Sequence, residues 1–221
     1  TTLKARSGGE WPPHLEIKLA SQHLNRSLDL SENGDMASAT ADNEIALTLF
    51  EGLALRFGPD VPLALELELA RARSIRAWLH SARGDQEGAT SSYNEVITAL
   101  LEARRRAGSA WRPFDEDALA TNYGARGTTL SLLEKWDDAI TDFAQAVELR
   151  QSLKLRLGEE WTPDMEDSLA SACFDLDGRN PVERSRLADL VALIGQGQLL
   201  AVTGDRQIVV DSFGAQKDQS A

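Results

Sequence analysis

Residues 111–160 read WRPFDEDALATNYGARGTTLSLLEKWDDAITDFAQAVELRQSLKLRLGEE. When the chain is written in lines of fifty residues that begin at Trp11, three successive lines align with one another without a gap. The repeats open with Trp11-Pro12, Val61-Pro62, Trp111-Arg112-Pro113 and Trp161-Thr162-Pro163. Self-similarity at a fixed period of 20–50 residues is the signature of a repeat protein, in which stacked units shelter each other's apolar faces.

Three columns of this self-alignment hold the same residue type in every repeat. They are arginine (Arg6, Arg56, Arg106, Arg156), glycine (Gly8, Gly58, Gly108, Gly158) and glutamate (Glu16, Glu66, Glu116, Glu166). An active site occurs once, whereas these residues recur, so we assign the charged columns a structural role. The short connection between repeats predicts the ion pairs Arg6–Glu16, Arg56–Glu66, Arg106–Glu116 and Arg156–Glu166. Each exposed pair contributes about 0–1 kcal/mol.

Each repeat contains two predicted helices. The first begins at the proline, which suits the first turn of a helix, and ends near Ser31, Arg83 or Leu132. The second runs over about 35–57, 85–107 and 135–157, with apolar residues three and four positions apart. The glycine column is then expected to end the second helix in the left-handed conformation. The fold class that follows is all-α, built from stacked helix pairs.

Repeat 3 also carries a recognisable motif. It reads Tyr123-x2-Arg126-Gly127-x2-Leu130 and then Ala139-x3-Phe143-x2-Ala146. This resembles the tetratricopeptide repeat (TPR), in which small residues lie where the paired helices cross and an aromatic residue interlocks them. The resemblance implies a right-handed superhelical solenoid of antiparallel helix pairs. The period of fifty is longer than the usual 34, and repeat 1 departs from the motif at Ser27 and Asn43.

The domain organisation follows from the period. We expect one helical repeat domain over residues 1–204, with repeats near 11–60, 61–110, 111–160 and 161–204. Residues 1–10 match the end of a second helix, which predicts a fragment of a longer array. A last helix is expected to start at Asn180-Pro181 and to reach Val202. The tail 205–221 is expected to cap the array or to be disordered, with a short strand near 207–210 as an alternative.

Composition narrows the function classes. The net charge of −12 disfavours binding to nucleic acid or to an anionic membrane surface, and no apolar run is long enough to span a bilayer. Cys173 is the only cysteine, and three histidines lack metal-ligand spacing. We therefore expect no catalytic residues, no metal and no cofactor, and a cytoplasmic location.

The candidate binding residues come from the resemblance, which places one column of the first helices on a concave face. Trp78 occupies that column, with Arg71 and Ser74 on the same helical stripe. The full candidate set is Leu24, Leu28, Arg71, Ser74, Ile75, Trp78, Thr121 and Thr128. Trp78 packed against a neighbouring helix is the alternative interpretation.

The predicted function is that of a scaffold whose concave groove binds a peptide or protein segment. In related repeats lysine, asparagine and arginine bind a terminal carboxylate, but the corresponding positions here include Leu24, Leu28, Ile75, Thr121 and Ala125. An apolar or helical partner segment is therefore favoured. The alternative function is a sensor or regulatory arm of a larger enzyme or signalling protein. Homodimerisation through terminal helices is a further hypothesis.

Overall fold

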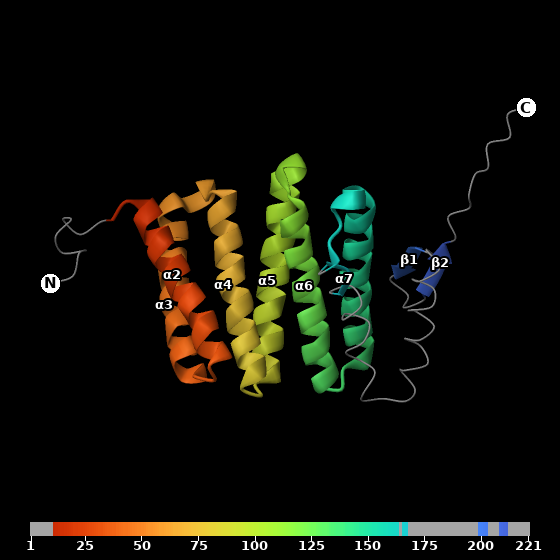
Figure 1. Cartoon of the computed structure of the whole chain (residues 1–221), viewed down its shortest axis with the longest axis horizontal. Coiled ribbons are helices and arrows are strands. Elements are labelled where there is room, and N and C mark those ends of the chain that lie inside the picture. The colour runs from red at the N-terminus through yellow and green to blue at the C-terminus, as the bar shows by residue number, and fades with distance from the viewer. Residues whose placement is uncertain (1–10, 164, 168–198, 203–207, 212–221) are drawn as a thin grey trace, which may run out of the picture. The chain divides into compact units, whose positions relative to one another are not determined.

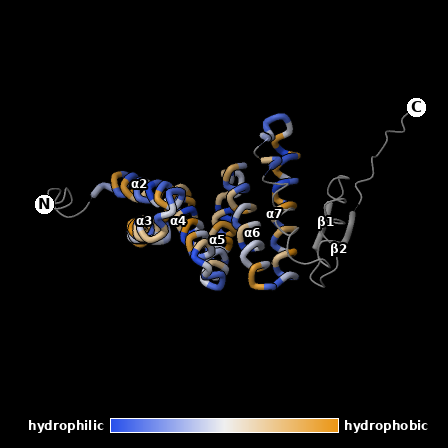
Figure 2. Tube along the Cα trace, turned by 60° about the horizontal axis from the view of Figure 1, so that its bottom comes forward, coloured by the Kyte–Doolittle hydropathy of each residue, from blue (hydrophilic) through white to orange (hydrophobic). Residues whose placement is uncertain are grey.

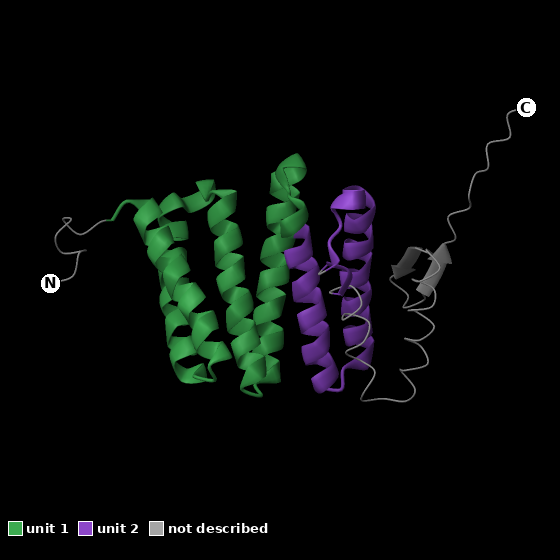
Figure 3. Cartoon of the chain, viewed as in Figure 1, with its two compact units in different colours: residues 1–115 green, residues 116–221 purple. Residues whose placement is uncertain are grey.

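The computed structural model describes residues 11–163, 165–167, 199–202 and 208–211. The chain divides into two compact units, residues 1–115 and 116–221 (Figure 3). Each unit is described by itself.

Unit 1 consists of four long helices (Figure 1). They are α2 (Pro13–Glu32), α3 (Met36–Phe57), α4 (Leu63–Ala82) and α5 (Gln86–Ala107). Short 3-10 turns, η1 (Gly58–Asp60) and η2 (Gly108–Ala110), follow α3 and α5. Each helix packs against the next along the chain, and α2 also contacts α4.

Unit 2 takes most of α6 (Pro113–Leu132), whose first turn belongs to unit 1, and then α7 (Trp136–Leu157) and η3 (Gly158–Glu160). Residues 163 and 165–167 are again helical. A two-stranded antiparallel sheet follows, formed by β1 (Leu199–Val202) and β2 (Ile208–Asp211), with Leu199 opposite Asp211. Strand β1 lies against α7.

The helix bounds confirm the predicted helix pairs and their spacing. The first helices end at residues 32, 82 and 132, and the second helices begin at residues 36, 86 and 136. The first helices start at residues 13, 63 and 113, and Pro12 and Pro62 hold the N-cap position before α2 and α4. The same fifty-residue step therefore sets both the sequence and the secondary structure.

The glycine column ends the second helices, but not in the predicted conformation. Gly58, Gly108 and Gly158 have φ of 59°, 50° and 52°, as expected for a positive-φ position. Their ψ values, −129°, −117° and −113°, lie outside the left-handed helical region. This is the mirror image of extended backbone, which turns the chain sharply and which residues with a Cβ avoid. The prediction of a left-handed cap is thus wrong in ψ.

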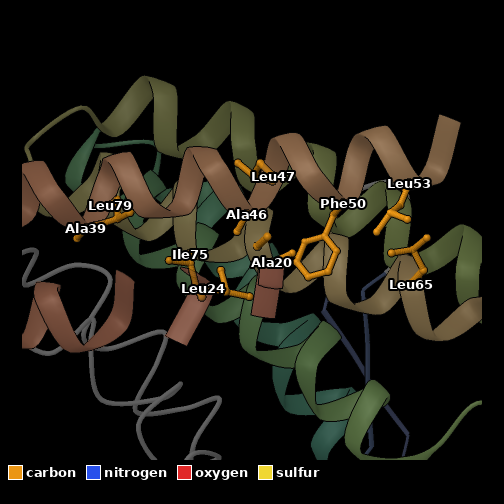
Figure 4. Close-up of a cluster of buried hydrophobic side chains, with 11 residues drawn as sticks. Ala20, Leu24, Ala39, Ala46, Leu47, Phe50, Leu53, Leu65, Ile75 and Leu79 are labelled. Atoms are coloured by element: carbon orange, nitrogen blue, oxygen red, sulfur yellow. The ribbon is translucent and has the colours of Figure 1, made fainter. Parts of the chain in front are cut away.

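The core of unit 1 is formed by the facing sides of α2, α3 and α4. Figure 2 shows hydrophobic and hydrophilic positions alternating around these helices, as amphipathic helices require. The buried cluster (Figure 4) contains Ala20, Leu24, Ala39, Ala46, Leu47, Phe50, Leu53, Leu65, Ala72, Ile75 and Leu79. Phe50 and Leu53 of α3 are fully buried in it.

The charged columns pair differently from the prediction. Arg56 Nη1 lies 3.2 Å from Glu16 Oε1, and Arg106 pairs with Glu66. The predicted partner was the glutamate of the following repeat, so the predicted register is wrong by one repeat. The two helices of a pair run in opposite directions, which brings the last turn of the second beside the first turn of the first. Arg6 lies outside the described residues.

The C-terminal region contains a further correction. The last predicted helix was to reach Val202, but Leu199–Val202 is a strand. The strand predicted as an alternative near 207–210 is confirmed by β2 at Ile208–Asp211. Branched residues such as Ile208, Val209 and Val210 favour strand over helix. The rest of repeat 4, the start of that helix at Asn180 and the tail beyond Ser212 lie outside the described residues.

Candidate protein-interaction surface

The candidate surface of unit 1 is centred on α4, which contacts both α2 and α3. Arg71, Ser74 and Trp78 lie three and four residues apart, so they share one face of this helix. Trp78 leaves 42% of its surface exposed and is one of the few large apolar side chains of the described residues that do so. This partial exposure is compatible with both interpretations, a ring packed on a neighbouring helix and a ring open to a partner.

Arg71 connects this face of α4 to α2. Its Nη2 donates a hydrogen bond to Asn25 Oδ1 at 3.2 Å, and its Nη1 lies 3.9 Å from Glu68 Oε2. The arginine side chain is 46% exposed, so the guanidinium is held in place yet reachable from solvent. A held guanidinium offers several donors to a carboxylate or a carbonyl of a bound segment.

Two of the predicted binding residues belong instead to the core. Leu24 has no exposed surface and Ile75 only 9%. Leu28 is half-buried and packs against the same cluster. These three side chains stabilise the helix pair that carries the surface, and the accessible apolar area is supplied mainly by Trp78. Ser74 is half-buried.

Thr121 and Thr128 lie in unit 2, on α6. Thr121 is exposed, and its Oγ1 accepts a hydrogen bond of 2.8 Å from Arg150 Nη2. Thr128 is half-buried, and its Oγ1 donates to the backbone oxygen of Gly124 at 3.1 Å. The predicted set is therefore divided between the two units, with six residues in unit 1 and these two threonines in unit 2.

A further arginine column was missed by the sequence analysis. It holds Arg26, Arg76 and Arg126 at the same position of the first helix in repeats 1 to 3. Each arginine pairs with an acid on the second helix of its own repeat. The pairs are Arg26–Asp42, Arg76–Glu95 at 2.9 Å and Arg126–Asp142 with two contacts of 2.6 Å. The recurrence of arginine in all three repeats was the available signal.

The pKa values of the two aspartates in these pairs shift in opposite directions. Hydrogen bonds from Arg26, assisted by His23, lower the pKa of the Asp42 carboxyl. Burial raises the pKa of the Asp142 carboxyl, although Arg126 donates to both its oxygens. Arg126 also lies over the Tyr123 ring, with its Cζ 5.5 Å from the ring centroid. In both repeats the acid lies within the helix pair, where its role is to hold the two helices together.

Unit 2 contains a buried arginine with no counterpart in the other repeats. Arg150 on α7 is 5% exposed, and its Nε lies 3.0 Å from Asp117 Oδ1 on α6. The same column holds Phe50 and Leu100 in repeats 1 and 2. Repeat 3 thus has a partly buried ion pair at a position where the other repeats carry apolar residues.

The described residues contain no group of three histidine, cysteine, aspartate or glutamate side chains arranged to hold a metal ion. Over the same part of the chain, no helix is both long enough and apolar enough to cross a bilayer.

Comparison with known proteins gives no assignment. No protein-family model matches the chain, and a search of curated proteins finds no significant match. The case for a function therefore depends on the repeat geometry and on the surface of unit 1.

Proposed function

We propose that the chain is a protein-binding scaffold and that its helix pairs stack as a right-handed, TPR-like superhelical solenoid. The resemblance in repeat 3 and the regular alternation of helices of 20 and 22 residues support this proposal. Stacked helix pairs form a preformed surface. Little of the scaffold has to become ordered when a partner binds, so the entropic cost of binding is small.

The observation that carries the binding role is the exposed indole of Trp78 on the same face of α4 as the held guanidinium of Arg71. Tryptophan and arginine are the residue types enriched at binding hot spots. The partner that fits this surface is a peptide or protein segment that places an apolar side chain on the indole and a carboxylate or carbonyl oxygen on the guanidinium.

The test is a selection of peptides from a random display library on the native chain, followed by binding measurements with variants. Trp78→Ala is expected to weaken binding of the selected peptides by about tenfold or more, as for a hot-spot residue. Arg71→Gln is expected to weaken binding less and to reduce its dependence on salt.

The matched control is Leu55→Ala, because Leu55 is 83% exposed and lies on α3, away from the stripe on α4. It is expected to leave peptide binding unchanged. Helical circular dichroism of all variants checks that unit 1 remains folded. If the selected peptides bind Trp78→Ala as tightly as they bind the native chain, the Trp78 surface is not the binding site.

A further inference from the structure

The turn between α2 and α3 carries a reactive dipeptide that the corresponding turns of the other repeats lack. It reads Asn33-Gly34, whereas the same positions hold Arg83-Gly84 and Leu133-Glu134. In an asparagine–glycine pair the backbone nitrogen of the glycine can attack the asparagine side-chain amide, because glycine has no side chain to hinder the close approach. Asn33 and Gly34 are both exposed. The pair is therefore open to water and to the base that the attack needs.

The folded turn holds both reacting groups in hydrogen bonds. Asn33 Nδ2 donates to the backbone oxygen of Asp29 at 2.8 Å, and the backbone nitrogen of Gly34 donates to the backbone oxygen of Ser31 at 3.0 Å. The attack requires a Gly34 nitrogen without its proton and an Asn33 side chain turned towards it, so both hydrogen bonds must first break. They belong to the last turn of α2, and the ends of helices open at little cost in free energy. Opening this turn releases the pair while the core of unit 1 stays folded.

We propose that Asn33 is a site of spontaneous deamidation in the folded chain and that the reaction proceeds through opening of the last turn of α2. The Gly34 nitrogen, after losing its proton to a base, bonds to Asn33 Cγ. The Cγ–Nδ2 bond breaks, and the amide group takes up a proton and leaves as ammonia. Water then opens the resulting succinimide ring at one of its two carbonyls, which gives an aspartyl or an isoaspartyl residue at position 33. This modification does not depend on the proposed binding function.

The product places a new negative charge where α2 is least able to accommodate it. Asp29, Glu32 and Asp35 already lie within four residues of the site, and the last turn of α2 contains no basic residue. A carboxylate at the C-terminal end of a helix is unfavourable, because the helix dipole is negative there. The reaction also removes the donor to the Asp29 oxygen. We expect the modified chain to melt about 2–4 °C lower in unit 1.

The test is incubation of the native chain at mildly alkaline pH, followed by proteolysis and mass spectrometry. The peptide with Asn33 is expected to show the mass of the deamidated product before the peptides with Asn25 and Asn94, which are exposed but precede arginine and glutamate. The same incubation in urea is expected to accelerate the reaction at Asn33 about tenfold. That factor corresponds to about 1.4 kcal/mol, which is the order expected for two exposed hydrogen bonds.

Asn33→Arg is the matched control, because it copies repeat 2. Arg83 has φ of −90° and ψ of 3°, close to the −81° and 2° of Asn33, so the substitution keeps the turn. The incubated Asn33→Arg variant is expected to keep its melting temperature. If Asn33 stays intact in the native chain for the time in which it reacts fully in urea, or if it reacts equally fast in both, the proposal is wrong. An equal loss of stability in the incubated native chain and in Asn33→Arg would show that deamidation at this turn does not destabilise unit 1.

Discussion

Gly127 of α6 lies close to Phe143 and to the backbone of Ala139 on α7, which leaves no room for a side chain. Its column holds Ser27, Ala77 and Gly127, and the column that faces it on the second helix holds Asn43, Tyr93 and Phe143 in the same order. In repeat 3 the smallest residue lies against a large aromatic ring, as close packing of the two helices requires.

This close contact predicts that Gly127→Ala destabilises unit 2, although alanine is the better helix former. A Cβ at Gly127 would lie 3.0 Å from Phe143 Cζ and 3.2 Å from the backbone oxygen of Ala139. The backbone cannot yield as a flexible side chain can, so we expect a loss of about 1–3 kcal/mol in the free energy of unfolding. Urea unfolding measures it.

Gly124→Ala is the control on the same helix. A Cβ at Gly124 meets nothing within 4 Å, so the substitution is expected to raise the free energy of unfolding by about 1 kcal/mol through helix propensity alone. Equal effects of the two substitutions would contradict the steric explanation for Gly127.

At the scale of the helix, the second helices of repeats 1 and 2 begin with a side-chain cap that repeat 3 lacks. Asp35 and Asp85 accept hydrogen bonds from the backbone N–H of Ser38 and Gly88, whereas Lys135 holds their column before α7. The hydrogen bond from Gly88, with help from His80, lowers the pKa of the Asp85 carboxyl. A lowered pKa means that the folded state binds fewer protons than the unfolded state as the pH falls towards the normal value.

Asp85→Ala is therefore expected to lower the melting temperature of unit 1 by about 2–4 °C at neutral pH. The cap's charge contributes fully above the unfolded pKa, about 3.9, and its contribution is lost as the pH falls through the lower folded value. The difference between the native chain and Asp85→Ala should thus shrink below about pH 4. Asp85→Asn keeps a neutral acceptor for Gly88, and its melting temperature should show no such pH-dependent difference from that of Asp85→Ala.

The turn inside each helix pair gives a second prediction at this scale. Gly34 and Gly84 have φ of 81° and 82°, and Glu134 takes the same place in repeat 3 with φ of 59°. A residue with a Cβ pays about 1 kcal/mol for this conformation. Glu134→Gly is expected to stabilise unit 2 by about that amount in thermal or urea unfolding. No change would mean that the glutamate side chain makes a compensating contact.

The helices were predictable from sequence because each repeat carries residues that start and end them. Prolines mark the helix starts and glycines mark the ends, and the alignment of three copies shows which positions matter. The backbone angle at Gly58 was not predictable, since glycine accepts several positive-φ conformations and the residue type does not choose among them. β1 was missed because the sequence before it continues an apolar pattern that also fits a helix.

At the scale of the whole molecule, the candidate surface was predictable only in part. Trp78 was identified from its column and Arg71 from the helical stripe that it shares with Trp78, and both are exposed. Leu24 was assigned to the surface but is buried, because the depth of a helical position depends on which neighbours cover it. The contact of Arg71 with Asn25 joins residues 46 positions apart, so no local pattern indicates it.

The comparison of repeats also shows where the interiors differ. Repeats 1 and 2 place Phe50 and Leu100 where repeat 3 places Arg150, and they place Ile17 and Leu67 where repeat 3 places Asp117. Both partners of the ion pair have therefore changed together from apolar residues. The Arg150 side chain is 6% exposed and that of Asp117 27%, so the pair recovers little net stability, because desolvation of the arginine offsets the attraction.

This interpretation predicts a difference between breaking the pair and replacing it. Asp117→Ala removes the carboxylate that Arg150 Nε contacts at 3.0 Å and should cost unit 2 about 3 kcal/mol of unfolding free energy. Asp117→Leu combined with Arg150→Leu copies the residues of repeat 2, and it should be as stable as the native chain or more so. Urea unfolding of the three proteins decides between the outcomes. A double variant as unstable as Asp117→Ala would show that the ion pair itself stabilises repeat 3.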